Sequence, residues 1–144
     1  MFSKACEYGI KATVHIATQS LHGNRVGLRD IANKIDSPEA FTAKILQLLV
    51  KAKIIDSAKG PSGGFAVNKD RVKETTLSEI VSAIDGDTIY KGCGLGLPEC
   101  SAKRPCPVHY KFKVIRDDLK RMLESVTVYE LSMNLKDGLT YLKR

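Results

Sequence analysis

The chain has 144 residues, a formal net charge of +7 at pH 7, and 43% hydrophobic and 27% charged residues. This length predicts one domain, and the composition excludes a largely disordered chain. No apolar run reaches the ~18 residues of a membrane span. Residues 1–20 carry charges inside their apolar pattern and no cleavage signal, which argues against a secretory leader. We therefore expect a cytoplasmic protein with no membrane partner.

The excess positive charge is unevenly distributed. Residues 1–72 contain eleven Lys and Arg against six Asp and Glu, a net of +5, whereas residues 73–144 contain twelve against ten, a net of +2. Basic residues strongly outnumber acidic ones between Lys44 and Lys73. A basic segment in an otherwise balanced chain is typical of proteins that bind polyanions, although a solvated basic surface shows the same pattern.

The first half of the chain predicts a helix-turn-helix followed by a hairpin. After a first helix capped by Ser3, we expect a short strand at 25–28 and a helix at 28–35. A second helix should be capped by Ser37 and end near Lys53. Its inward residues are expected to be Phe41, Ile45, Leu48 and Leu49. Two β-like runs, 54–58 and 65–67, flank a glycine-rich turn. This order predicts a winged helix-turn-helix, whose second helix enters the major groove of DNA while the hairpin lies along phosphates or in the minor groove. The same fold used only for protein contacts is the alternative.

The second half predicts a loop followed by a long helix. Thr76–Glu79 is a capping box that opens a helix, and residues 87–107 are rich in glycine and proline. Apolar residues then recur at heptad spacing, at Val108, Phe112, Ile115, Leu119, Met122 and Val126. So narrow a stripe needs a partner helix, and the simplest partner is the same helix of a second copy, in a two-fold homodimer. Packing within the same chain is the alternative.

A second capping box at Thr127–Glu130 starts a last helix. The predicted fold class is mainly α with a small β-hairpin wing, namely a winged helix-turn-helix plus a long dimerisation helix. We divide the chain into a DNA-binding domain (1–86), a cysteine-bearing loop (87–107), a dimerisation helix (108–126) and a C-terminal helix that packs back on the winged domain (127–144).

Three of the four cysteines, Cys93, Cys100 and Cys106, fall within fourteen residues, whereas Cys6 suits a packing role. In a reducing compartment such a cluster indicates metal or redox chemistry. Thiolates bind iron–sulfur clusters and zinc, and a four-ligand site needs one more group. His109 is the nearest candidate; Glu7 or Cys6 of a second subunit, or a small exogenous thiol, are the others.

Three further interpretations of the cysteine loop stay open. Zinc sites normally have closer cysteine spacing than this loop has. A metal-free disulfide switch needs only two of the three thiols. A Cys106–His109 nucleophile pair lacks an orienting third group, so we do not expect an enzyme.

Taken together, these parts resemble the Rrf-two family of bacterial transcriptional regulators over nearly the whole chain. The resemblance is carried by the opening helix (3–17), the Leu-Arg-Asp-Ile-Ala run (28–32), the Lys-Gly-Pro-Ser-Gly-Gly-Phe wing (59–65), the cysteine triplet and the Cys-Pro-Val-His entry (106–109) to the long helix.

The resemblance implies a homodimeric DNA-binding repressor. In it, a [2Fe-2S] or [4Fe-4S] cluster on the three cysteines senses redox state, nitric oxide, iron or cluster supply. Some members complete the site with a histidine just after the third cysteine, which matches His109. Others use an acidic residue early in the first helix of the other subunit, near the position of Glu7. The first cysteine gap is one residue longer than is common. Cluster-free members controlled by a protein partner are the alternative, as is regulation by thiol oxidation.

The resemblance also places the contacts to double-stranded operator DNA. Lys44 and Gln47 of the second helix suit guanine and adenine edges, and Lys59 matches a basic residue at the wing tip that enters the minor groove. The full expected set is Lys11, Thr42, Ala43, Lys44, Gln47, Lys59, Ser62 and Gly63.

Overall fold

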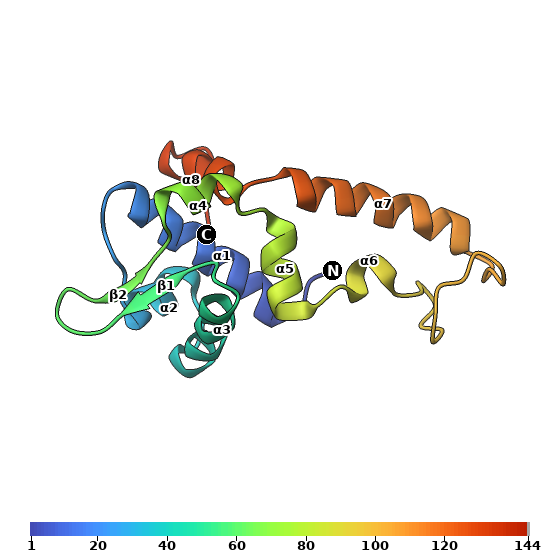
Figure 1. Cartoon of the computed structure of the whole chain (residues 1–144), viewed down its shortest axis with the longest axis horizontal. Coiled ribbons are helices and arrows are strands. Elements are labelled where there is room, and N and C mark those ends of the chain that lie inside the picture. Colours follow the sequence, from blue (N-terminus) through green and yellow to red (C-terminus); the bar gives the residue numbers. More distant parts are fainter. Residues whose placement is uncertain (144) are drawn as a thin grey trace.

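The computed structural model describes residues 1–143, which form a mainly helical chain with one two-stranded antiparallel sheet (Figure 1). The predicted fold class is confirmed. In chain order the elements are α1 (Lys4–Leu21), α2 (Leu28–Ile35), α3 (Glu39–Lys51), β1 (Asp56–Ala58), β2 (Gly64–Ala66), α4 (Lys69–Glu74), α5 (Leu77–Asp85), α6 (Thr88–Lys91), α7 (His109–Ser125) and α8 (Val128–Lys136). Within the described residues, no helix is both long and apolar enough to cross a membrane.

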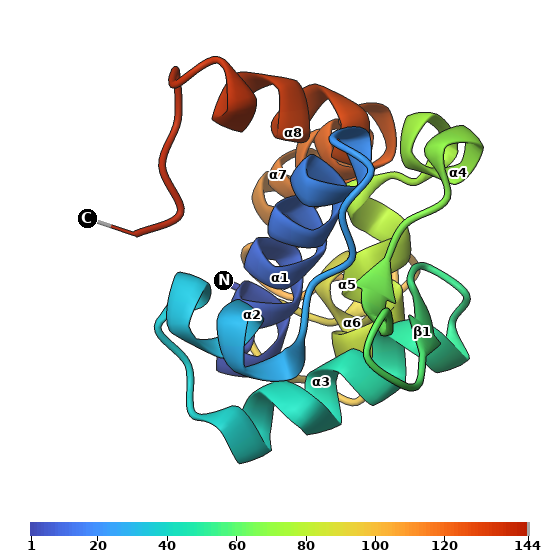
Figure 2. The same ribbon diagram turned by 90° about the vertical axis from the view of Figure 1, so that its left-hand side faces the viewer.

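Helix α1 forms the centre of the globular part. The Ser3 side chain accepts a hydrogen bond from the Cys6 N–H at 3.0 Å, so the predicted cap is confirmed. Figure 2 shows α1 between α8 on one side and α3 on the other. Its apolar residues are buried on more than one side, and Cys6, Ile16 and Ala17 are fully buried. Helices α2, α3, α4, α5 and α8 and strand β2 all pack against α1.

The turn between α2 and α3 differs from the prediction in its cap. Pro38 occupies the position before the first helical residue, and no side chain caps α3. The Ser37 hydroxyl instead lies within hydrogen-bond distance of Thr42 Oγ1, at 3.0 Å. The predicted Ser37 cap is wrong because the helix starts one residue later than expected, which leaves the proline in the cap position.

The inward face of α3 is also rotated from the predicted one. Its buried stripe consists of Thr42, Ile45, Leu46 and Leu49, at the spacing of one helix face. Phe41 and Leu48 lie at the edge of this stripe and are 36% and 41% exposed, so their predicted burial is wrong.

The wing is a short hairpin fastened to the start of α2. β1 and β2 pair antiparallel with Ser57 opposite Phe65, and Val26 adds a single bridge to Phe65 where a strand was expected. The Arg25 guanidinium donates to the Gly64 carbonyl at 2.8 Å and pairs with Asp56. The segment before α2 thus holds the hairpin both by backbone pairing at Val26 and by the guanidinium of Arg25.

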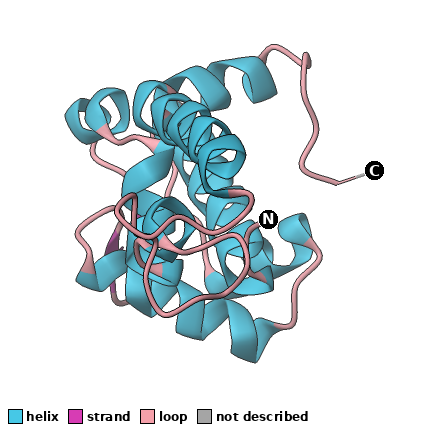
Figure 3. Cartoon of the chain, turned by 90° about the vertical axis from the view of Figure 1, so that its right-hand side faces the viewer, coloured by secondary structure: helices cyan, strands magenta, loops and turns pink. Residues whose placement is uncertain are grey.

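The long helix α7 leaves the globular part and carries the cysteine loop at its far end. Its C-terminal end is fixed by Leu123, which is fully buried, and by a bridge between Thr76 and Thr127 that joins the start of α5 to the α7–α8 junction. In Figure 1 the cysteine loop and the wing lie at opposite ends of the long axis, and Figure 3 shows the loop in front of α7. Part of the segment expected to be loop forms the short helix α6.

Substitution of Gly64 tests how tightly the wing is fixed. Its φ is +109°, and an added Cβ would lie 2.8 Å from the Val26 carbonyl oxygen. We expect Gly64→Ala to lower the free energy of unfolding by about 1–3 kcal/mol, measured by urea denaturation. Gly23→Ala is the matched control, because Gly23 also has a positive φ but has no atom within 4 Å of the added carbon. Equal losses in the two variants would contradict a clash with Val26.

Candidate functional site

The exposed side of α3 presents a polar and basic row. Lys44 and Gln47 are exposed and Ala43 is half-buried, as a base-reading surface requires. Thr42 is completely buried, and its hydroxyl donates to the Pro38 carbonyl at 2.9 Å. The expectation that Thr42 faces DNA is therefore wrong, because this side chain belongs to the inward stripe of the helix.

The wing displays the other expected DNA residues. Lys59 and Ser62 are exposed at its tip, and Gly63 is half-buried within the turn. A Cβ on Gly63 would lie 2.3 Å from the Ala58 carbonyl oxygen, so the tight turn requires glycine there. In Figure 2, α3 and the hairpin lie on the side of α1 away from α8. The two basic elements therefore occupy the same part of the molecule.

Lys11 differs from the other expected contacts. It is half-buried on α1, and its Nζ lies 5.7 Å from the centre of the Tyr8 ring. It also lines a small cavity with Asp36 and with Tyr141 of the C-terminal segment. Its ammonium group thus lies beside an aromatic ring and the helix-turn-helix turn.

The cysteine loop brings its sulfur atoms together in two pairs. Cys93 Sγ lies 3.9 Å from Cys106 Sγ, and Cys100 Sγ lies 3.3 Å from His109 Nδ1. All three cysteines are partly buried and none forms a disulfide. The four predicted ligands of this chain are therefore close to one another in pairs.

Hydrogen bonds from the loop backbone act on the first of these thiols. The Leu95 N–H points to Cys93 Sγ at 3.4 Å. This bond, with a second from the Leu97 backbone, lowers the pKa of Cys93, and the nearby Arg116 charge acts in the same direction. The loop thus makes the Cys93 thiolate, the form that binds metals, easier to form than in an ordinary cysteine.

His109 is the first residue of α7 and is 5% exposed. Its backbone N–H donates to the Cys106 carbonyl at 3.0 Å, which fixes the start of the helix against the third cysteine. Its Nε2 is buried and has no hydrogen-bond partner within residues 1–143. A buried polar atom without a partner is uncommon, and a metal ligand is one of the roles that explain it.

The three cysteines and His109 have the chemistry of ligands to a thiolate-bound metal group. Their donor atoms do not, however, surround a single point. Among the described residues, no three His, Cys, Asp or Glu side chains are close enough together to hold a metal ion. The soft thiols, the adjacent imidazole and the unpartnered His109 Nε2 agree with an iron–sulfur ligand set. Binding would require the two pairs to converge, and a loop rich in glycine permits this.

The alternative ligands lie on α1. Glu7 is partly exposed, and the Lys4 ammonium, 2.9 Å away, lowers the pKa of its carboxyl group. Cys6 is fully buried in the core of its own chain, so its thiol is not available to a second subunit.

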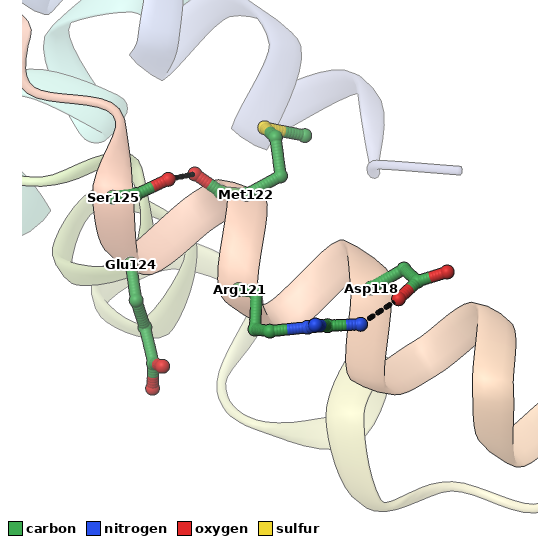
Figure 4. Close-up of a pocket in the computed structure, with 5 residues that line it drawn as sticks. All are labelled: Asp118, Arg121, Met122, Glu124 and Ser125. Atoms are coloured by element: carbon green, nitrogen blue, oxygen red, sulfur yellow. Dashed lines mark hydrogen bonds and ion pairs between the residues drawn. The ribbon is translucent and has the colours of Figure 1, made fainter.

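The heptad stripe on α7 is divided between two environments. Leu119 and Val126 pack against the core, and Phe112 contacts the cysteine loop, where a Cβ on Gly94 would lie 2.8 Å from its ring. Ile115 and Met122 remain 62% and 42% exposed. In Figure 4, Met122 projects from α7 on the side opposite Glu124. Part of the predicted stripe therefore stays free for a partner.

One residue of the cysteine loop region was not expected from the sequence. Arg116 points from α7 into the loop, where its Nη2 donates to Cys100 Sγ at 3.0 Å and its Nη1 donates to the Gly92 carbonyl. The sequence holds only a partial signal of this contact: His109, Arg116 and Leu123 recur every seven residues, which places Arg116 on the same face of α7 as His109. That spacing does not identify Cys100 or Gly92 as its partner.

The fold and this interface define a winged helix-turn-helix protein of the kind that regulates transcription. A profile of the Rrf2 family, described as an iron-dependent transcriptional regulator, matches residues 2–134. The chain belongs to this family, and it is a transcriptional regulator rather than an enzyme.

Individual relatives agree with this assignment. An HTH-type transcriptional regulator of Aquifex aeolicus is 30% identical over 134 residues, which cover 91% of this chain and 90% of the relative. The HTH-type transcriptional regulator IscR of Escherichia coli strain K12 is 27% identical over 127 residues, covering 88% and 76%. The solved structure of CymR, the global cysteine regulator of B. subtilis, superposes with a TM-score of 0.74 at 19% identity, covering 92% of this chain and 96% of CymR. That last similarity concerns the fold.

The four cysteines should differ in their reactivity toward an alkylating reagent. Burial raises the pKa of Cys6 from its ordinary value of 9.0 to about 12, which lowers the thiolate fraction at neutral pH about a thousandfold. We expect iodoacetamide to modify Cys93, Cys100 and Cys106 in the native cluster-free protein and to spare Cys6, as read by peptide mass spectrometry. Labelling in denaturant, where all four should react, is the control. Rapid native labelling of Cys6 would show that the N-terminal end of α1 opens in solution.

Proposed function

We propose that the protein is a homodimeric repressor that binds operator DNA through α3 and the wing and senses redox, nitric oxide, iron or cluster status through an iron–sulfur cluster on the cysteine loop. The observation that carries the proposal is the grouping of Cys93, Cys100, Cys106 and His109 at the far end of α7, with all three sulfurs partly buried. The family description and the IscR relative support it.

In this proposal the three cysteines hold the cluster, and His109 is the fourth ligand. His109 is favoured over Glu7 of the partner subunit because its ring already contacts Cys100 and its Nε2 has no partner in the described chain. When bound, the cluster supplies one-electron chemistry and sensitivity to oxidants and nitric oxide, as a [2Fe-2S] or a [4Fe-4S] centre. The protein's own residues hold the loop against α7 and exclude part of the solvent.

The exposed part of the α7 stripe, Ile115 and Met122, supports a dimer in which α7 of each copy packs against the other. Two recognition helices then meet successive major grooves, about 34 Å apart on one side of the duplex. A change in the loop that shifts α7 alters that separation, and a coupling of about 1–3 kcal/mol is enough to change DNA affinity 5–150-fold.

A cluster-free regulator controlled by thiol oxidation or a protein partner is the second candidate. The distance of 3.9 Å between Cys93 Sγ and Cys106 Sγ favours the oxidation variant, because a small movement would bring the two sulfurs to bonding distance. In that case the anaerobically purified protein is colourless.

Substitution of the loop cysteines tests the cluster. We expect Cys93→Ala, Cys100→Ala and Cys106→Ala each to abolish the visible absorption, bound iron and bound sulfide obtained after anaerobic reconstitution. Circular dichroism and light scattering should still show a folded dimer. Cys6→Ala, which removes a core thiol, should retain the cluster. His109→Ala should change the spectrum, whereas Glu7→Ala should not. Unfolding of the loop variants would point to a structural zinc site instead.

Substitution of two lysines tests the DNA interface. With a duplex selected by the wild-type protein from a random library, we expect Lys44→Ala to lose about 1–3 kcal/mol of discrimination at one base pair. Lys59→Ala should weaken binding to all sequences and lower the slope of log K against log salt by about one. Lys120→Ala, on α7 and paired with Glu124, is the control of equal charge. An unchanged salt slope in the Lys59 variant would exclude the wing tip from the phosphate contacts.

A further inference from the structure

Arg116 lies between the cysteine loop and α7 and contacts both sides. It stands midway along α7, two turns after His109, and its side chain crosses to the loop. Nη2 donates to Cys100 Sγ at 3.0 Å, and Nη1 donates to the carbonyl of Gly92, the residue before the first loop cysteine. One guanidinium therefore joins two points of the loop that are eight residues apart in sequence.

The surroundings of Arg116 leave its charge without an ordinary partner. Within residues 1–143, no carboxylate lies within salt-bridge distance of it; the neighbouring Asp117 is paired with Lys113 at 2.6 Å. Its Nε is buried and has no hydrogen-bond partner in the same range. A guanidinium remains protonated in proteins, and a buried charge is costly without an opposite charge nearby. Within the described residues, the guanidinium donates to the Gly92 carbonyl oxygen and to the Cys100 sulfur and to no other acceptor.

Cys100 is consequently held from two directions. Arg116 Nη2 approaches its sulfur on one side and His109 Nδ1 lies 3.3 Å from it on another, and both groups come from the same face of α7. Within residues 1–143, neither Cys93 nor Cys106 forms a hydrogen bond with a charged side chain; the two sulfur atoms face each other. The middle cysteine is thus the one whose position is tied to the helix.

We propose that Arg116 is the positioning residue of the cysteine loop. It fixes Gly92 and Cys100 on α7, and it keeps its N–H···S hydrogen bond to Cys100 when that sulfur becomes a cluster ligand. Its positive charge and its hydrogen bond then favour the reduced, more negative state of the cluster and raise its reduction potential. The positioning of the loop by Arg116 does not depend on a bound cluster. The effect on the reduction potential rests on the cluster proposed above.

The experiment compares full-length wild-type protein with Arg116→Ala and Arg116→Lys. Arg121→Ala is the matched control: it removes the same charge from the same helix, but Arg121 is exposed and pairs with Asp118, as Figure 4 shows. The first measurement is hydrogen exchange of residues 92–100 in the cluster-free protein. The second is the midpoint potential after anaerobic reconstitution with iron and sulfide.

We expect Arg116→Ala to accelerate exchange across the loop and to lower the midpoint potential. Arg121→Ala should match the wild type in both measurements. Arg116→Lys keeps the charge but loses the planar fork, so it should restore much of the potential and little of the protection from exchange. If Arg116 had only a structural role, hydrogen exchange and midpoint potential in Arg116→Lys would change together.

Two results overturn the inference. If loop exchange and potential in Arg116→Ala equal those of the wild type, Arg116 does not position the loop. If Arg121→Ala changes both measurements as much as Arg116→Ala does, the effect comes from the charge of α7 and not from the hydrogen bonds of Arg116 to the loop. Should the wild type take up no cluster at all, the proposed cluster function fails, and loop exchange alone then supports or refutes the role of Arg116.

Discussion

The organisation of the molecule depends on the two faces of α7. One face repeats every seven residues as His109, Arg116 and Leu123, and it turns toward the chain's own loop and core. The adjacent stripe leaves Ile115 and Met122 exposed. Because both faces belong to one rigid helix, the residues that hold the cysteine loop and those available to a second subunit cannot move independently.

In the proposed function, this arrangement places the sensing loop and the DNA-binding wing at opposite ends of the molecule. The loop lies at one end of the long axis and the wing at the other, with α1 between them (Figure 1). The connection runs through packed elements: α7 ends at the Thr76–Thr127 bridge, which joins it to α5 and α8, and these helices cover α1. In the proposed function, a signal from the loop would therefore have to reach α3 through helix packing.

The sequence predicted the helix-turn-helix, the hairpin and the long helix in the correct order because glycines, caps and heptad spacing act locally, but it did not predict the short helices α4 and α6. It failed where neighbouring elements decide the outcome. Thr42 has a polar side chain, which is usually exposed. It can be buried here because its hydroxyl is within hydrogen-bond distance of the Pro38 carbonyl and the Ser37 hydroxyl. Phe41 is apolar, yet it lies at the edge of the buried stripe of α3 and remains partly exposed. Arg116 looked like one of several charges off the heptad stripe, since a contact across the cysteine loop has no local signature.

The anchoring of α7 at one end has a mechanical consequence. The helix has 17 residues, so at 1.5 Å per residue it is about 25 Å long. If α7 tilts about the Thr76–Thr127 bridge, the helix acts as a lever. A tilt of roughly 5° at the pivot moves the loop end by about 2 Å over that length. The reverse also holds: a shift of ångström size at the cysteines becomes a small rotation at the pivot, which the rigid helices transmit as a change of angle.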